Sequence, residues 1–403
     1  MPNLFNIPYR KYMIWQAGVL FILMQFFLQL SSGIVIGAIM RDLHLSALMA
    51  GFLASSIYFV YTSFQIPVGI LFDRKNTRVL LTINSLLCGI GCLVFASSST
   101  LLGLFTGRIL IGAGSAFAFV GYSHILREHI PLKHFAFLLG FSETLAFLVT
   151  VAGMISMGEL LAVWGWRNFI YAVGSAGFII SFLCWHYIPD SPKPSGPMPH
   201  YGRQLLRILK NPRAWTNGLF VGLSFTIVTV FGALWAIPFL QVKLNINLAT
   251  ASLLGAMFFL GAGVSCPLFG YLSVKFARKP LILASCLSTA SLLLFTLFAP
   301  IQSHFTMGIL MFAIGSACGA YMLAFSIANE LAPKNSLSTC TGFTNTLAML
   351  TAPIFQTLIG YFLDKLSEDK VYSLWNYQIA LSIIPIALAL ASFLVIWLPE
   401  KKS

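Results

Sequence analysis

The stretch from Ala47 to Arg78 reads ALMAGFLASSIYFVYTSFQIPVGILFDRKNTR. Residues 47–71 carry no charged side chain, and a basic cluster at Arg74, Lys75 and Arg78 follows directly. A run of about 20 apolar residues is long enough to cross a hydrocarbon layer about 30 Å thick. Because every backbone group in that layer must be hydrogen-bonded within its own segment, this run predicts a transmembrane helix.

Runs of the same kind recur along the whole chain of 403 residues, of which 58% are hydrophobic and 9% are charged. Charged residues make up about a quarter of a typical soluble domain, so this composition indicates a membrane protein. The alternation of polar and apolar residues that a membrane β-barrel requires does not occur. We expect twelve transmembrane helices, at residues 14–40, 47–71, 79–96, 100–126, 135–158, 167–188, 215–239, 248–271, 280–299, 304–329, 337–362 and 377–398.

The formal net charge of +13 comes from basic residues in short clusters between the apolar runs. This distribution is typical of loops on the cytoplasmic side of a membrane and differs from a basic face that binds nucleic acid. Eighteen of the 24 Lys and Arg residues fall on one side of the predicted spans and five on the other, with Arg108 inside a helix. We therefore expect both termini in the cytoplasm, and a lipid bilayer rather than nucleic acid as partner.

Several matched positions are separated by half the length of the chain. They are Gly69 and Gly270, Gly140 and Gly342, and Gly114-Ser115-Ala116 and Gly315-Ser316-Ala317, each pair 201 or 202 residues apart. Repeated halves are typical of secondary transporters, which bind substrate where the repeats meet. The expected fold is an all-α membrane protein with two pseudo-symmetric six-helix bundles, at residues 1–188 and 215–403.

The predicted linker between these bundles, residues 189–214, has two parts of different composition. It opens rich in proline, which favours an extended and stiff chain. It continues as a basic amphipathic stretch at residues 203–210, which we expect to lie on the anionic surface of the membrane. A linker that is simply solvated is a compatible interpretation.

The segment Gly69-Ile-Leu-Phe-Asp73-Arg74-Lys75-Asn76-Thr77-Arg78 resembles the loop signature of the major facilitator superfamily. Asn76 stands where the family usually has Gly, and we expect it to keep the left-handed turn of that position. The resemblance implies that Asp73 meets the positive N-terminal end of a helix in the other half and closes the cytoplasmic side. Gly69, Arg74 and Arg78 then belong to the same gate, although the basic residues could also act only as topology anchors.

A second segment, Arg108-Ile-Leu-Ile-Gly112-Ala-Gly114, resembles the signature of the fourth helix in the same family. The sequence around residues 65–69 and 107–121 is similar to bacterial permeases for sugar phosphates and organic anions. Residues 140–153 contain no proline, unlike the Gly-Pro-rich fifth helix of proton-driven drug exporters. Membership would imply a monomeric secondary transporter of this fold.

Two ionisable residues lie well inside predicted spans, Arg108 and Glu143. Placing a charge there costs about 2.5–3.5 kcal/mol on insertion scales, so each must face a partner, a cavity or the bundle interior. A static ion pair between them is one interpretation. In the other, Arg108 attracts an anionic or polar solute while Glu143 takes up and releases a coupling proton.

Other polar side chains recur at helical spacing and, by the family resemblance, would line the substrate cavity. Those assigned to substrate binding with Arg108 are Gln25, Gln29, Tyr58, Tyr61, Tyr122, Trp235, Tyr321 and Asn345. A single Tyr or Trp in a membrane protein is more often a packing residue or an interfacial anchor, which is the alternative interpretation.

Together these features predict a proton-coupled secondary transporter of the bacterial inner membrane that moves a small anionic or zwitterionic solute by alternating access. The alternatives within transport are an uncoupled facilitator or exchanger, and a siderophore or drug transporter. A transporter-derived sensor is the alternative outside transport. The seven cysteines lack metal-ligand spacing and the chain has no nucleotide-binding loop, so we expect no enzyme activity, no metal and no cofactor.

Overall fold

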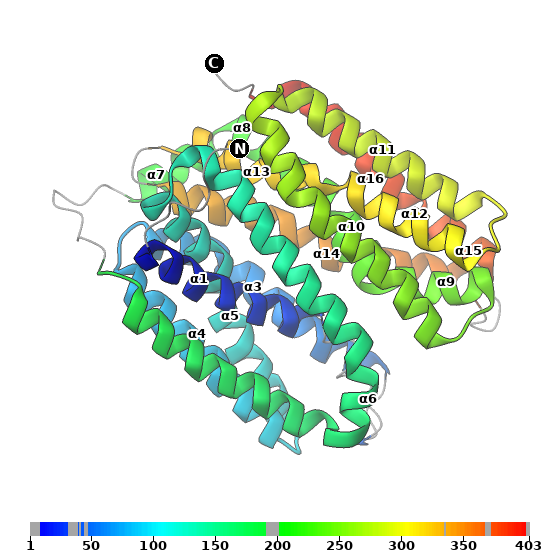
Figure 1. Ribbon diagram of the computed structural model, residues 1–403, viewed down its shortest axis with the longest axis horizontal. Helices are drawn as coiled ribbons and strands as arrows, with labels where there is room; N and C mark the ends of the chain where they lie inside the picture. Colours follow the sequence, from blue (N-terminus) through cyan, green and yellow to red (C-terminus); the bar gives the residue numbers. More distant parts are fainter. Residues whose placement is uncertain are drawn as a thin grey trace. The chain divides into compact units, whose positions relative to one another are not determined.

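The computed structural model describes residues 9–30, 39, 42–43, 47–190, 201–333, 336–366 and 372–399. Every regular element in this part of the chain is a helix. The chain divides into two compact units (Figure 1). Unit 1 comprises residues 1–135, 156–210 and 332–343, and unit 2 comprises residues 136–155, 211–331 and 344–403.

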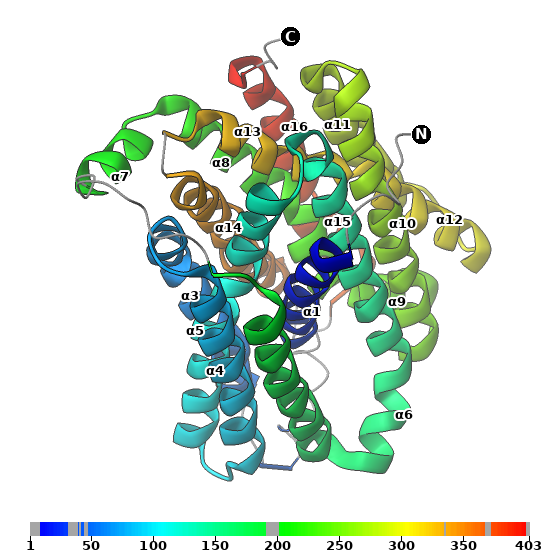
Figure 2. The same cartoon turned by 60° about the vertical axis from the view of Figure 1, so that its left-hand side comes forward.

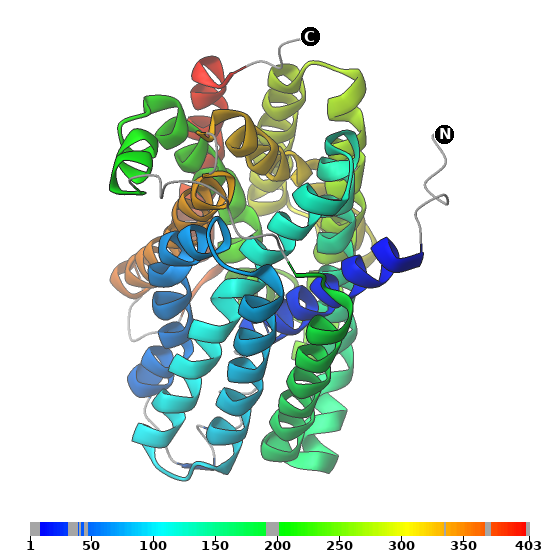
Figure 3. The same cartoon turned by 90° about the vertical axis from the view of Figure 1, so that its left-hand side faces the viewer.

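Unit 1 is built on four helices and the second part of a long fifth one. The helices are α1 (Tyr9–Leu30), α3 (Ala47–Phe72), α4 (Thr77–Ser97), α5 (Leu101–His129) and residues 156–187 of α6 (Leu132–Tyr187). Helices α3, α4 and α5 run side by side, as both Figure 2 and Figure 3 show. The end of the predicted first span, residues 31–38 and 40, lies outside the described residues.

The amphipathic stretch predicted in the linker forms a short helix of unit 1, α7 (Tyr201–Leu209). Arg203 and Arg207 are exposed on it, whereas Ile208 is buried. Residues 191–200, the proline-rich part of the predicted linker, lie outside the described residues.

Helix α6 contains two predicted spans joined by a break. Gly165 has φ 73° within it, a conformation that a residue with a side chain rarely adopts. The stretches His134–Gly153 and Trp164–Tyr187 on the two sides of the break are each long and apolar enough to cross a membrane. Residues 136–155 belong to unit 2 and residues 156–187 to unit 1, so the change of unit within α6 precedes the break at Gly165.

Unit 2 takes the helices of the second half of the chain, together with residues 136–155 of α6 and residues 344–366 of α14. Its other elements are α8 (Pro212–Thr226), the π-helix η1 (Ile227–Trp235), α9 (Ala236–Leu244), α10 (Leu248–Lys275), α11 (Arg278–Phe298), α12 (His304–Ala317), the 3₁₀ turn η2 (Gly319–Met322), α13 (Leu323–Leu331), α15 (Leu374–Leu381), α16 (Ile383–Leu394) and the 3₁₀ turn η3 (Val395–Trp397). Helices α10 and α12 pack along their length (Figure 1). Helix α14 (Leu337–Leu366) begins in unit 1 and continues in unit 2.

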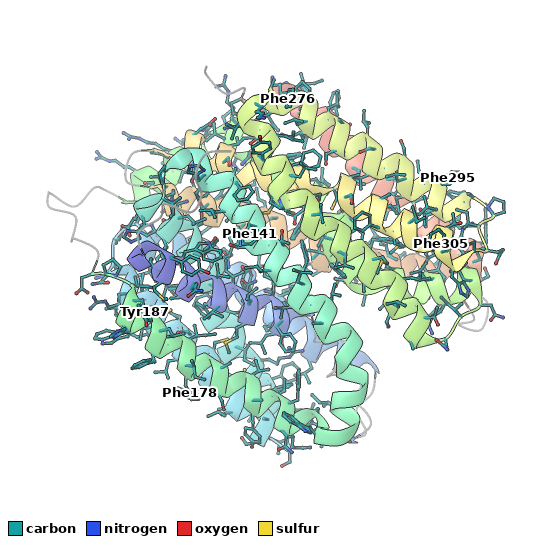
Figure 4. All side chains as sticks on the ribbon, viewed as in Figure 1. Phe141, Phe178, Tyr187, Phe276, Phe295 and Phe305 are labelled. Atoms are coloured by element: carbon teal, nitrogen blue, oxygen red, sulfur yellow. The ribbon has the colours of Figure 1, made fainter. Side chains whose placement is uncertain are left out.

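Eleven helical stretches of the described chain are long and apolar enough to cross a membrane, and Ser56–Phe72 is a shorter apolar stretch within α3. Together they account for the twelve predicted spans, so the predicted helical membrane fold is confirmed. Large aromatic side chains such as Phe178, Phe295 and Phe305 are exposed on these helices (Figure 4). An exterior of this kind is suited to lipid.

Candidate functional site

Arg108 lies within the helical bundle of unit 1 and is 4% exposed. Its guanidinium carbon is 5.3 Å from the centroid of the Phe95 ring on α4. It also interacts electrostatically with Tyr58 on α3 and with Cys92 on α4. Gly107 permits this packing, because a Cβ there would lie 2.6 Å from the Phe95 Cβ. The aromatic face of Phe95 therefore stabilises the buried cation.

Two glutamines of α1 extend this polar cluster. Gln25 Nε2 donates a hydrogen bond of 3.0 Å to Gln29 Oε1, and the Tyr58 hydroxyl donates one of 3.4 Å to the Gln29 carbonyl. Gln25 Oε1 and Gln29 Nε2 are buried and have no hydrogen-bond partner among the described residues. We call Gln25, Gln29, Tyr58 and Arg108 the Arg108 cluster; it combines a fixed cation with amide groups that can still accept and donate hydrogen bonds.

Two other tyrosines assigned to substrate binding lie elsewhere in unit 1. Tyr61 is fully buried one turn after Tyr58, and its carbonyl accepts a hydrogen bond of 3.3 Å from Gln65. The Tyr122 hydroxyl accepts a hydrogen bond of 2.9 Å from the Trp15 indole on α1. Tyr122 comes 14 residues after Arg108 on α5. At a rise of 1.5 Å per residue, the two lie about 21 Å apart along the helix axis. The structure therefore does not bring Tyr122 to Arg108, although both fall on one stripe of the helix.

Glu143 lies in the part of α6 that belongs to unit 2 and is 4% exposed. Its Oε2 atom is buried and has no hydrogen-bond partner among the described residues. The carboxyl group interacts electrostatically with Tyr321 on η2 and with Cys266 on α10. Arg108 and Glu143 fall in different units, so their pairing stays a prediction.

Trp235 and Asn345 are the remaining predicted substrate-binding residues of unit 2. Trp235 is the last residue of η1, and its indole Nε1 is buried without a hydrogen-bond partner in the described part of the chain. A Cβ at Gly360 of α14 would lie 3.7 Å from the Trp235 ring, so the indole packs against α14. Asn345 is 2% exposed on α14. A π-helical turn such as η1 is frequent at functional sites.

The carboxylate of Asp73 caps the N-terminus of α14. It accepts hydrogen bonds from the backbone N–H of Ser338 at 2.8 Å and of Thr339 at 2.7 Å, and from the Thr339 hydroxyl at 2.6 Å. The first N–H groups of a helix have no partner within it and carry positive partial charge, so a carboxylate there is stabilising. The residues that meet here, 73 and 338–339, all belong to unit 1.

Two residues at the end of α5 complete this contact, and the sequence did not single them out as part of a gate. Arg127 donates to the Ser338 hydroxyl at 2.8 Å and to the Thr341 hydroxyl at 3.0 Å, and it interacts electrostatically with Asp73. His124 Nδ1 lies 2.7 Å from the same Ser338 hydroxyl. We call Asp73, His124, Arg127, Ser338 and Thr339 the α14 cap.

Asn76 corrects one expectation, because it has φ −63° and does not form a left-handed turn. Its side chain instead accepts a hydrogen bond from the Arg78 N–H and caps the start of α4. Arg78 turns to the end of α6, where it donates to the Ile188 carbonyl at 2.6 Å and pairs with Asp190 at 3.1 Å. Asparagine is among the best N-cap residues, which accounts for this choice.

Arg74 follows Asp73 in the same loop and is half-buried. Its backbone N–H donates to the Leu71 carbonyl at 3.1 Å, so the chain continues the last turn of α3 there. The gating role assigned to Gly69, Asp73, Arg74 and Arg78 stays a prediction.

In each unit, two glycines at positions related by the repeat lie directly against the backbone of a neighbouring helix. We call this contact the glycine seam. In unit 1, Gly69 of α3 abuts the backbone of Ser338 and Thr339, and Gly342 of α14 abuts the Gln65 carbonyl. In unit 2, a Cβ at Gly270 would lie 2.7 Å from the Ala136 carbonyl oxygen, and one at Gly140 would lie 2.6 Å from the Cys266 carbonyl oxygen. Val274 stands where the repeat would place a second Asp73, so only the first copy has a carboxylate.

Comparison with known proteins agrees with this architecture. A family model described as Major Facilitator Superfamily matches residues 17–347 and 219–403. The chain belongs to the Major Facilitator Superfamily. The relatives that it matches include transporters, so this chain is a membrane transporter rather than an enzyme.

Three relatives illustrate the range of this superfamily. The probable galactarate/D-glucarate transporter GarP of Escherichia coli strain K12 is 22% identical over 377 residues, which cover 81% of this chain and 82% of GarP. The uncharacterized transporter YybO of Bacillus subtilis strain 168 is 26% identical and covers 85% of each chain. The multidrug resistance protein MdtG of Yersinia enterocolitica is 24% identical and covers 72% of each chain.

Solved structures of the superfamily share the fold. The E. coli fucose:proton symporter FucP has a TM-score of 0.71 at 14% identity, over 93% of this chain and 97% of FucP. A bacterial homologue of the human lysosomal transporter Spinster, in an inward-facing and unoccupied conformation, has a TM-score of 0.66 at 17% identity, over 96% of each chain.

Proposed function

We propose that this chain is a proton-coupled secondary active transporter of a small organic anion or zwitterion. The observation that carries the proposal is Glu143, a carboxyl group buried in a membrane span whose Oε2 has no hydrogen-bond partner among the described residues. Burying a carboxyl group inside a membrane costs free energy, so such groups mark functional sites. Proton relays in transporters are built from them. Glu143 takes up the coupling proton on one side of the membrane and releases it on the other.

The Arg108 cluster supplies the recognition of the solute in this proposal. Its guanidinium attracts a carboxylate, and the amide groups of Gln25 and Gln29 offer hydrogen bonds to hydroxyl or amino groups. The relative GarP is named a probable galactarate/D-glucarate transporter, so D-glucarate and galactarate are the first probes. Both combine carboxylates with several hydroxyl groups.

Alternating access then requires a contact that forms and breaks at the membrane surface, and the α14 cap is the candidate. Asp73 and Arg127 hold the first turn of α14 through four hydrogen bonds of 2.6–2.8 Å that involve Ser338 and Thr339. We place this contact on the cytoplasmic side of the bacterial inner membrane, with both termini on that side. The protein works as a monomer.

The test has two stages. A thermal-shift screen of the purified protein compares D-glucarate, galactarate, neutral sugars, zwitterionic amino acids and lipophilic cations, because only ligands of the folded state raise its melting temperature. Stabilisation by organic anions or zwitterions is expected. Stabilisation by lipophilic cations alone would favour drug export.

The second stage measures uptake of the stabilising solute into proteoliposomes under a pH gradient. The wild type accumulates it, whereas Glu143→Gln loses accumulation and keeps exchange of labelled for unlabelled solute. Accumulation that persists in Glu143→Gln would remove Glu143 from the coupling, whereas no accumulation by the wild type would assign the protein to the uncoupled facilitators.

A further inference from the structure

A phenol and a thiol lie close to the part of α6 that carries Glu143 in unit 2, because Cys266 abuts Gly140 and hydrogen-bonds with Tyr321. The Tyr321 hydroxyl and the Cys266 sulfur are 3.3 Å apart, and each interacts electrostatically with Glu143. Tyr321 is 2% exposed and Cys266 is fully buried. We call Glu143, Cys266 and Tyr321 the Glu143 cluster; its members interact in a space from which bulk water is excluded.

The backbone brings three elements together at this cluster. Helix α12 ends at Ala317, and the 3₁₀ turn η2 that follows carries Tyr321. A Cβ at Gly319 would lie 2.8 Å from the Cys266 backbone nitrogen, and one at Gly140 would lie 2.6 Å from the Cys266 carbonyl oxygen. Two glycines from two other elements thus close on the backbone of one residue of α10, and this fixes Tyr321 and Cys266 relative to α6.

The hydrogen-bonding capacity of these groups sets how they can act. A tyrosine hydroxyl has one proton to donate and also accepts, whereas a thiol donates weakly. When the Cys266 thiol donates to the Tyr321 oxygen, the phenol proton is left for another acceptor. The Tyr321 ring is held against Phe225, with ring centroids 4.6 Å apart, so the position of the hydroxyl oxygen is fixed while its proton can turn to an acceptor.

We propose that Tyr321, supported by the Cys266 thiol, is the positioning residue that donates a hydrogen bond to the ionised Glu143 carboxylate. It thereby sets the pH range in which Glu143 gains and loses its proton. Cys318, beside Gly319, is a further titratable group here, and it interacts with both Cys266 and Tyr321. This inference rests on the proposed role of Glu143 as proton carrier.

The test titrates Glu143 directly and needs no transported solute. Infrared difference spectra of the purified protein in lipid contain the C=O stretch of the protonated carboxyl group, which is identified by its loss in Glu143→Gln. The pH midpoint of that band is measured in the wild type and in Tyr321→Phe, which keeps the ring against Phe225. We expect the midpoint to rise by about one pH unit, a tenfold change in proton affinity, because a hydrogen bond to the charged form is lost.

Two cysteine variants and one control complete the test. Cys266→Ser keeps a donor for Tyr321 and should keep the wild-type midpoint, whereas Cys266→Ala should shift it in the same direction as Tyr321→Phe. Cys286 is a buried thiol on α11 of the same unit, and Cys286→Ser should leave the midpoint unchanged.

An unchanged midpoint in Tyr321→Phe overturns the inference, as does an equal shift in Cys286→Ser. If Tyr321→Phe does not fold, Cys266→Ala decides, and an unchanged midpoint there has the same meaning. The proposed function fails by a different result, namely pH-driven accumulation in Glu143→Gln, so the two failures are distinguishable.

Discussion

The hydrogen bonds at the start of α14 give the sharpest quantitative prediction, for the variant Asp73→Asn. The wild-type carboxylate accepts two backbone N–H bonds, at 2.8 and 2.7 Å, and a third bond from the Thr339 hydroxyl. An asparagine keeps one carbonyl acceptor, but it loses the charge and turns an amide N–H₂ toward the other donors. The side chain keeps nearly the same size, so the change isolates charge and acceptor capacity.

The magnitude follows from the bonds that are lost. A hydrogen bond to a charged group contributes about 1.5–3 kcal/mol. A carboxylate at a helix N-terminus contributes about 0.3–1 kcal/mol through the helix dipole. We take about 2 kcal/mol as the net loss, since the surroundings relax, and this corresponds to an increase of about 30-fold in the population in which the contact is open.

A native thiol reports on this contact. Cys340 follows directly after Thr339, is 1% exposed, and interacts electrostatically with Asp73 and Arg127. Labelling by a maleimide in native membranes, read peptide by peptide with mass spectrometry, should therefore require that the contact opens. We expect the initial rate of Cys340 labelling to rise about 30-fold in Asp73→Asn.

Asp190→Asn is the matched control, because it removes a carboxylate that pairs with Arg78 at 3.1 Å and does not touch α14. It should leave Cys340 labelling at the wild-type rate. An unchanged rate in Asp73→Asn, or an equal rise in Asp190→Asn, would refute the reasoning.

Two further substitutions test the recognition of the solute and the glycine seam. Arg108→Gln should weaken binding of D-glucarate by about 1.5–3 kcal/mol and leave neutral ligands unaffected, measured by thermal shift; equal losses for both would exclude charge recognition. Gly69→Ala places a methyl group against the Ser338 backbone and should raise Cys340 labelling through a cost of about 1–3 kcal/mol. Gly255→Ala, where a Cβ would meet its nearest neighbour at 3.4 Å, is the control and should have no such effect.

The number and order of the spans could be predicted because each is a long apolar run, and this signal does not depend on tertiary contacts. The repeat was equally visible. Gly69 and Gly270 stand 201 residues apart, and each meets a helix backbone in its own unit. At both positions a glycine is needed for the same reason, because only a residue without a side chain lets the two helix backbones approach this closely.

Depth along a helix could not be predicted in the same way. Helical spacing places Arg108 and Tyr122 on one stripe, yet Tyr122 pairs with Trp15 and Arg108 lies against Phe95. The period of a helix tells which face a residue occupies, whereas the partner at each level depends on how neighbouring helices cross.

Partners at helix ends were also missed, because they come from distant parts of the chain. Asn76 has the residue type of an N-cap and directly precedes the helical run from Thr77, and this local signal could have corrected the expected left-handed turn. Arg127 gave no such signal, since a basic residue at a helix end has the same sequence pattern whether it anchors topology or binds α14.

The central claim is that Glu143 carries the proton that accompanies the solute. The most direct measurement is the external pH of a suspension of proteoliposomes, held at zero membrane potential, when D-glucarate is added. Wild-type protein should alkalinise the medium as the solute enters, while Glu143→Gln should exchange labelled D-glucarate without any change of pH. Alkalinisation of equal size in Glu143→Gln would contradict the account.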